Sequence, residues 1–406
     1  MRRALVIVAV VIVLTGVGVF VYLRFFANLS SVVVTPATEA GFPSAGQGAV
    51  NTGQTSSTFT TAGPVSVSAR LVQIAKGPIA LGESVVDASS TPTIFSSATL
   101  GTSTSDVLVS YIDRQSGNVY VYSENAGHIV RTSDKTLPGI ENAFWLPSGR
   151  AAFVQYLSGT DFSTVNTYLL QANGTNGFFL PQDLSGLDVS STSILALASG
   201  LNGSVASREH FDGAHATQVF STPLSSIRAS FAGKNQYLVF TKPSALLEGD
   251  AYLVGTSGLL SRIAGPLLGL SALASPSGKL VLVSYSEAGV MKMELVTTAT
   301  GAVTPLPLGT IADKCAWTAD SSAIYCGVPV DPPTTGVYPD SWYQGVTHFS
   351  DNLWKIDVAG RYAQLVLNFT KETGGSLDAE SLAIDPSGST LAFINKNDGS
   401  LWSYRL

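Results

Sequence analysis

The sequence has few charged residues and no basic block. Only 12% of its 406 residues are charged, and 22 Lys and Arg stand against 28 Asp and Glu, which gives a formal net charge of −6. A nucleic-acid partner needs a basic face that neutralises phosphates, so this composition argues against nucleic-acid binding. It disfavours adsorption to an anionic membrane surface for the same reason.

Cysteine and histidine are also scarce. Two cysteines, Cys315 and Cys326, are too few for a disulfide framework or a structural zinc site. Of the four histidines, His210 and His215 are five residues apart and flank an Asp-Gly turn, which is not the spacing of a metal-ligand pair on a helix. We therefore expect no metal site and no cofactor.

Long apolar runs are limited to one. Residues 4–23 carry no charge, and they follow Arg2 and Arg3. Twenty residues at 1.5 Å rise span about 30 Å, the thickness of the hydrocarbon core. A cleaved signal peptide is the alternative, but its apolar region is shorter and ends in small residues, whereas Arg24 and two phenylalanines follow this run. We expect residues 1–26 to be an uncleaved single-pass anchor in the cytoplasmic membrane, with the N-terminus in the cytoplasm and the rest outside, periplasmic or extracellular.

Residues 27–66 have the composition of a flexible linker. They are rich in Ser, Thr, Gly, Ala and Pro, and Glu39 is their only charged residue. Such a segment cannot bury enough apolar surface to offset the entropy of ordering. As a coil of this length it would reach roughly 35 Å.

From residue 67 onward the apolar residues alternate in short runs, and Asn-Gly or Asp-Gly turns separate several of them. Five such runs share a tight turn, at Pro147, Gly233, Pro276, Ala319 and Pro386, and the intervals are 86, 43, 43 and 67 residues. Degenerate copies at 101–109 and 188–197 fill the remaining places. The sequence thus predicts seven copies of a repeat of about 43 residues.

A repeat of that length with four short strands is a propeller blade, and stacking blades in a ring buries both faces of each sheet. The turns resemble the Ser-Pro-Asp-Gly turns of TolB-type, WD-repeat-like propellers, and segments 136–145 and 338–344 resemble parts of uncharacterised membrane-anchored bacterial propellers. The resemblance implies an all-β, seven-bladed β-propeller over residues 67–406, with the first strand of each blade along the channel. The last copy provides three strands, so we expect residues 68–75 to supply the fourth and close the ring.

The two cysteines stand on either side of one repeat turn. If Trp317 faces Ile324 in the hairpin, Cys315 faces Cys326, within reach of a disulfide. Export favours the bond; two buried thiols are the alternative.

The 67-residue interval contains an insertion at about residues 329–349 of the sixth blade. Long insertions in compact folds are usually functional or disordered, and the aromatic content of this one argues against disorder. We expect a contact surface for a glycan or peptide, formed by Tyr338, Asp340, Trp342, Tyr343 and Phe349. The alternative is a structural cap.

No catalytic residues are predicted. A Gly-x-Ser-x-Gly elbow is missing, and no paired carboxylates stand out for glycoside hydrolysis. We therefore expect a non-enzymatic binding or scaffolding module that engages a protein or glycan of the cell envelope. The alternatives are a propeller enzyme of lyase, lactonase or glycosidase type with its site at the channel mouth, and a carbohydrate-binding propeller. Buried carboxylates at the channel would favour an enzyme, and a lining of Ser, Thr and Ala would not.

Overall fold

The computed structural model describes residues 63–88, 106–175, 177–332 and 337–406. The expected membrane anchor at 1–26 and nearly all of the expected linker at 27–66 lie outside these residues. Within them, no helix is both long and apolar enough to span a bilayer.

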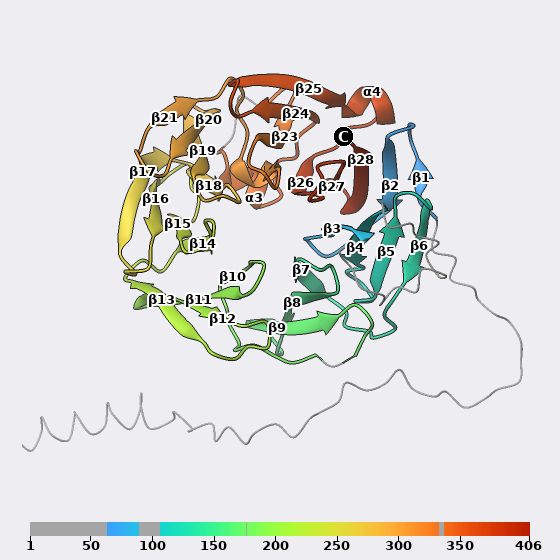
Figure 1. The fold of residues 1–406 in the computed structure, drawn as a ribbon, viewed down its shortest axis with the longest axis horizontal. Coiled ribbons are helices and arrows are strands. Elements are labelled where there is room, and N and C mark those ends of the chain that lie inside the picture. The colour runs from blue at the N-terminus through green and yellow to red at the C-terminus, as the bar shows by residue number, and fades with distance from the viewer. Residues whose placement is uncertain (1–62, 89–105, 176, 333–336) are drawn as a thin grey trace, which may run out of the picture. The chain divides into compact units, whose positions relative to one another are not determined.

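Seven antiparallel sheets follow one another around a ring, which confirms the expected all-β, seven-bladed propeller (Figure 1). Blades 1 to 3 contain β3 (Ser84–Asp87), β4 (Val107–Ile112), β5 (Val119–Ser123) and β6 (His128–Arg131); β7 (Ile140–Trp145), β8 (Ala151–Ser158) and β9 (Thr164–Gln171); and β10 (Gly186–Val189), β11 (Ile194–Gly200), β12 (Gly203–Glu209) and β13 (Thr217–Thr222).

Blades 4 to 6 contain β14 (Ile227–Phe231), β15 (Tyr237–Thr241), β16 (Glu248–Val254) and β17 (Leu260–Leu268); β18 (Ser271–Ala274), β19 (Leu280–Glu287), β20 (Val290–Thr297) and β21 (Val303–Pro305); and β22 (Cys315–Trp317), β23 (Ala323–Pro329), β24 (Asp351–Asp357) and β25 (Tyr362–Asn368). Blade 7 contains β26 (Ala379–Ile384), β27 (Thr390–Asn395) and β28 (Ser400–Arg405), joined by β2 (Leu71–Ala75) and β1 (Val65–Ser66). Three short helices occur among the described residues, η2 (Ala312–Lys314), α3 (Asp340–Tyr343) and α4 (Phe369–Thr373).

The ring is closed by the N-terminal strand. β2 pairs antiparallel with β28, with Leu71 opposite Tyr404, and so is the fourth strand of blade 7. Residues 65–66, which the sequence analysis assigned to the linker, form β1 and pair with β2. The first and last strands of the propeller therefore share one sheet.

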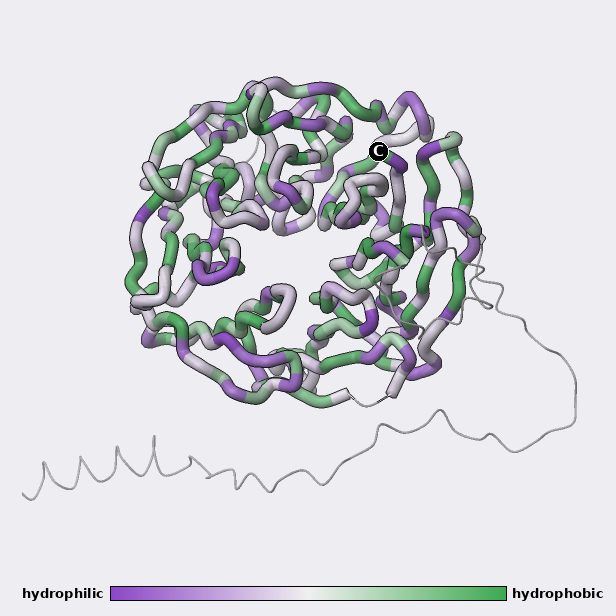
Figure 2. Tube along the Cα trace, in the orientation of Figure 1, coloured by the Kyte–Doolittle hydropathy of each residue, from purple (hydrophilic) through white to green (hydrophobic). Residues whose placement is uncertain are grey.

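Adjacent blades pack face to face through apolar side chains. Hydrophobic segments recur around the whole ring, separated by more hydrophilic ones (Figure 2). Leu238 and Phe240 of blade 4, for example, pack in one buried cluster with Val281 and Val283 of blade 5. Burial of each such side chain contributes about 1.5–3 kcal/mol, so the inter-blade layers are the main source of stability.

In a four-stranded blade, the loop between the second and third strands and the connection to the next blade open on the same face. We call it the mouth face. The insertion of blade 6 joins β23 to β24, a second-to-third-strand loop, and contains α3. α3 lies toward the centre of the ring (Figure 1).

Candidate functional site

The aromatic residues of the insertion point inward. Tyr338, Trp342 and Phe349 are 4%, 3% and 5% exposed and pack with Ile311 in one buried cluster, and Tyr343 is half-buried beside them. Three of the four rings therefore fold against the propeller, as the structural-cap alternative expects, instead of forming an outward contact surface. Their apolar area is the physical reason, because burial removes it from water.

The insertion makes side-chain hydrogen bonds well beyond its own blade. Asp340 accepts a hydrogen bond from the Ala245 amide of blade 4 at 2.6 Å. The Tyr343 hydroxyl donates to Asp313 Oδ2 at 2.9 Å, in the connection that leads into blade 6. Together with contacts to blade 7, these bonds fix α3 across the edge of the channel.

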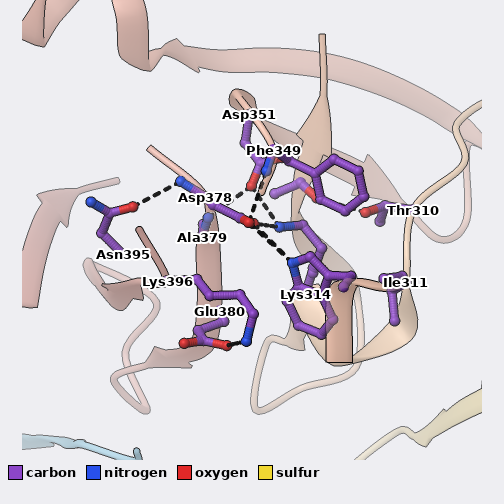
Figure 3. Close-up of polar contacts among 12 residues, drawn as sticks. Thr310, Ile311, Lys314, Phe349, Asp351, Asp378, Ala379, Glu380, Asn395 and Lys396 are labelled. Carbon is purple, nitrogen blue, oxygen red and sulfur yellow. Dashed lines mark hydrogen bonds and ion pairs between the residues drawn. The ribbon is translucent and has the colours of Figure 1, made fainter. Parts of the chain in front are cut away.

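A buried lysine joins the insertion to blades 6 and 7 (Figure 3). Lys314, at the end of η2, is fully buried; its ammonium lies 2.8 Å from Asp351 Oδ2 and also forms an ion pair with Asp378. It stacks over the rings of Trp342 and Phe349, each centroid 5.1 Å away. Because an isolated buried charge is very costly, these partners are required for Lys314 to remain in this position.

Asp351 is the member of this cluster whose charged form burial disfavours most clearly. Burial raises the pKa of its carboxyl group to about 6; the Lys314 ammonium acts against the rise and the Asp378 carboxylate adds to it. Oδ2 accepts from the Ala379 amide at 2.7 Å, whereas Oδ1 has no hydrogen-bond partner among the described residues. The three charged side chains of the cluster, Lys314, Asp351 and Asp378, are fully buried, and we interpret the cluster as structural.

The channel mouth itself contains a cavity of about 680 Å³. Six of the seven blades contribute to its lining, which contains Leu81, Ser185, Arg228, Lys242, Pro243, Leu273, Ala312, Asp313, Cys315, Trp342, Tyr343, Glu380, Ser381, Leu382 and Lys396. Of the five residues predicted as a contact site, the structure places Trp342 and Tyr343 at this cavity and the others away from it.

Two ion pairs stand in the wall of the cavity. Arg228 lies 2.5 Å from Asp313 Oδ2, and this carboxylate raises the pKa of the guanidinium group. Lys396 lies 3.0 Å from Glu380 and 4.5 Å from the centroid of the Trp342 ring. The exposed Lys242 forms no ion pair within the described part of the chain, so the lining carries one cation in excess.

A buried carboxyl group lies next to the cavity. Glu83 is 7% exposed, and neither of its carboxylate oxygens makes a hydrogen bond of normal geometry with the described residues. Burial raises its pKa well above the usual range, the nearby Ser381 hydroxyl lowers it, and Glu380 raises it again. Burial likewise raises the pKa of Glu380, and Lys396 opposes that rise.

Ser381 reaches the cavity through an irregularity of its strand. The pairing of β26 with β27 shifts register between Glu380 and Ala383, and Ser381 has a φ of 51°. Such bulges redirect a side chain and often lie beside functional sites.

Sequence reasoning missed Arg228, Asp313, Glu380 and Glu83. One signal was available, because Arg228 and Glu380 are each the second residue of an inner strand, β14 and β26. A charge so placed faces the channel mouth.

Histidine plays no part in the cavity. His210 and His215 lie near each other on the opposite face, with ring centroids 5.2 Å apart. Within the described residues, no group of three or more His, Cys, Asp or Glu side chains is arranged to hold a metal ion.

The architecture defines the class: a seven-bladed β-propeller closed by its N-terminal strand. No known protein family and no curated protein matches the sequence. Similar solved structures include an oligogalacturonate lyase in complex with manganese, 9% identical over 84% of this chain and 95% of its own, with a TM-score of 0.57. The oligogalacturonate lyase of Vibrio parahaemolyticus is 10% identical over 82% of this chain and 93% of its own, with a TM-score of 0.52.

A TolB propeller, the type that the repeat turns resemble, is also among the similar structures. The putative TolB of Agrobacterium tumefaciens is 15% identical over 54% of this chain and 73% of its own, with a TM-score of 0.38. At these identities the likenesses concern the fold.

Proposed function

We propose that this propeller is a binding module whose site is the cavity at the channel mouth, and that its ligand is small, hydroxylated and anionic, such as an acidic sugar. The observation that carries the proposal is the cavity lining: the wall ion pairs are already neutral, and Lys242 supplies an uncompensated cation. A carboxylate on the ligand would pair with the Lys242 ammonium and neutralise its charge.

The rest of the lining fits a sugar-like ligand. Ser185, Ser381 and Tyr343 offer hydroxyl groups, and Leu273 and Leu382 offer apolar surface. Small-ligand sites commonly combine an apolar lining with a few polar groups that set orientation. The aromatic insertion then supports the site from one side, through Tyr343.

An oligogalacturonate is the first probe, because two propellers of similar fold are lyases of that name. We expect trigalacturonate to bind the full chain, purified in detergent, in isothermal titration calorimetry, and neutral galactotriose to bind at least about tenfold more weakly. A charge-assisted hydrogen bond contributes about 1.5–3 kcal/mol, which corresponds to a factor of ten or more. Equal binding of both sugars, or of neither, would reject the acidic-ligand class.

Two lysines of blade 4 provide the matched control. Lys242 lines the cavity, and Lys234 is exposed in the turn between β14 and β15, on the opposite face. Lys242→Ala should weaken trigalacturonate binding about tenfold, and Lys234→Ala should leave it unchanged. Equal effects of the two substitutions would indicate general electrostatics and not this site.

A second candidate is an enzyme acting on the same class of ligand. Buried carboxyl groups at the channel favour it, and Glu83 has a raised pKa and no hydrogen-bond partner of normal geometry among the described residues, a state suited to proton transfer. Incubation with trigalacturonate, followed by chromatography of the products, separates the two functions. Turnover that Glu83→Gln abolishes would establish the enzyme; binding without turnover would support the binding module.

We further propose that the propeller is displayed outside the cytoplasmic membrane, held by the apolar segment 4–23, where it meets a protein or glycan of the cell envelope. The full chain should then remain in membranes through carbonate extraction. Protease added to cells without their outer layers should cut within residues 27–62. A soluble mature chain that begins near residue 28 would contradict this arrangement.

A further inference from the structure

Exposed apolar side chains are concentrated on the mouth face. Nine large apolar side chains of the described residues are more than half exposed, and six of them lie in the second-to-third-strand connections of five blades or, for Val290, at the first strand residue after one. Blade 4 contributes two of the six, and blades 2, 3, 5 and 6 contribute one each. The six are Phe162, Leu201, Leu246, Leu247, Val290 and Val346. We call this set the apolar rim.

The rim is prominent by exposure as well as by number. Leu201 is fully exposed, Leu246 and Val346 are each 74% exposed, and Phe162 is 67% exposed. Isolated surface leucines are common, but six large exposed apolar side chains at the tips of successive blades on one face are the arrangement that a partner protein could cover.

Carboxylates accompany the rim in four of its five blades. Asp161 precedes Phe162, Glu248 follows Leu247, Glu287 pairs across the turn with Val290, and Asp331 lies in the insertion that contains Val346. All four carboxylates are exposed and form no ion pair within the described part of the chain. Lys242 and Lys292 are the exposed lysines of these loops and their adjoining strands, so acidic charge predominates.

We propose that the apolar rim and its carboxylates form a docking surface for a protein that presents apolar and basic side chains together. The four carboxylates argue against a lipid bilayer as the occupant, because an anionic membrane surface would repel them beside the apolar tips. A protein with interspersed Lys or Arg satisfies both features. This surface lies on the same face as the cavity but does not depend on the ligand proposed for it.

The probe is an amphipathic helical peptide made only of Leu and Lys, titrated into the full chain in detergent. Phe162→Ser combined with Leu247→Ser should weaken its binding at least about tenfold, because central apolar anchors contribute roughly 2 kcal/mol or more. The control is Leu259→Ser combined with Tyr362→Ser, two exposed apolar residues beside the third-to-fourth-strand turns on the opposite face. The rim variant and the control variant are measured in the same detergent, so peptide binding to the micelle contributes equally to both affinities.

The charge contribution is tested separately. Asp161→Asn with Glu248→Gln should weaken the peptide and reduce the salt dependence of its affinity, while a Leu and Glu peptide should not bind. Equal loss in the rim and control variants, or binding of the Leu and Glu peptide as tight as that of the Leu and Lys peptide, would overturn the proposal.

Further measurements distinguish a basic protein from two other occupants, an anionic lipid bilayer and a second copy of the chain. An environment-sensitive dye at Phe162→Cys should report the peptide but remain unchanged in nanodiscs of phosphatidylglycerol alone. A change in those nanodiscs would assign the rim to lipid, and a dimer seen by sedimentation that Phe162→Ser with Leu247→Ser dissociates would assign it to a second copy of the chain. Either result would overturn the basic-protein proposal, and neither bears on sugar binding by the cavity.

Discussion

Trp342 and Asp378 connect two blades through one hydrogen-bonding group. The indole Nε1 of Trp342, in the insertion of blade 6, donates to the two carboxylate oxygens of Asp378 at 3.2 and 3.1 Å, directly before the inner strand of blade 7. The same carboxylate accepts from the Phe349 amide at 2.9 Å and pairs with Lys314. The insertion therefore contributes to the junction between the last two blades, where the ring is also closed by β2.

This hydrogen bond predicts that Trp342→Phe destabilises the propeller while an aromatic ring remains in the lining of the cavity. The substitution keeps most of the buried ring and removes the donor, so the free energy of unfolding should fall by about 1–3 kcal/mol in chemical denaturation. Tyr343→Phe removes the hydroxyl of a half-buried residue and should cost less stability, while it weakens ligand binding at the cavity. A Trp342→Phe variant as stable as the parent would show that the indole bond to Asp378 has no structural role.

The Lys314 cluster predicts a pH dependence of stability. Burial raises the pKa of Asp351 to about 6, above its ordinary value of about 4. The folded state then holds this proton more tightly than the unfolded chain, so the contribution of Asp351 is fully present below about pH 4 and is lost as the pH rises through about 6. Asp351→Asn should remove that part of the slope, measured by urea denaturation from pH 4 to pH 8. Identical slopes in the parent and the variant would contradict the assignment.

The fold could be predicted from local sequence because its repeat is local. The turn between the first two strands of a blade needs tight geometry, and Pro147, Pro276 and Pro386 mark it at intervals that reveal the period. The sequence could not predict that blade 2 has three described strands, with a single bridge between Tyr168 and Phe179 in the place of the fourth. Outer strands are the least buried, and their pattern is correspondingly weak.

The site could be predicted only in part, because its residues meet through the ring and not through the chain. Arg228 and Asp313 are 85 residues apart, and no local pattern relates them. The aromatic content of the insertion was visible in the sequence, but the sequence did not show whether these side chains point into the propeller or out to solvent. Asp378 lies outside the insertion, and its carboxylate provides the buried acceptor that holds Trp342 inward.

Ring closure gives the next prediction. Deletion of residues 65–75 removes β1 and β2 and leaves β28 as an unpaired, apolar edge, which favours aggregation. We expect this variant to be insoluble or to lose its cooperative thermal transition. Deletion of residues 30–60, which the propeller strands do not include, should leave the melting temperature unchanged. Equal tolerance of both deletions would show that β2 is dispensable for closure.

The hairpin of blade 6 gives the last prediction. β22 and β23 pair with Cys315 directly opposite Cys326, in the register that the turn predicts, and a disulfide joins the two residues in the structure. The bond closes a loop with a sequence separation of 11, so the chain-entropy estimate of its stabilisation is about 3 kcal/mol. Mass spectrometry of the purified full chain, alkylated without reductant, should find the two cysteines linked. Reductant should lower the melting temperature of the parent and leave that of the Cys315→Ala, Cys326→Ala variant unchanged, because the variant has no bond to lose. Complete alkylation of both thiols under denaturing, non-reducing conditions would show that the protein carries two buried thiols instead.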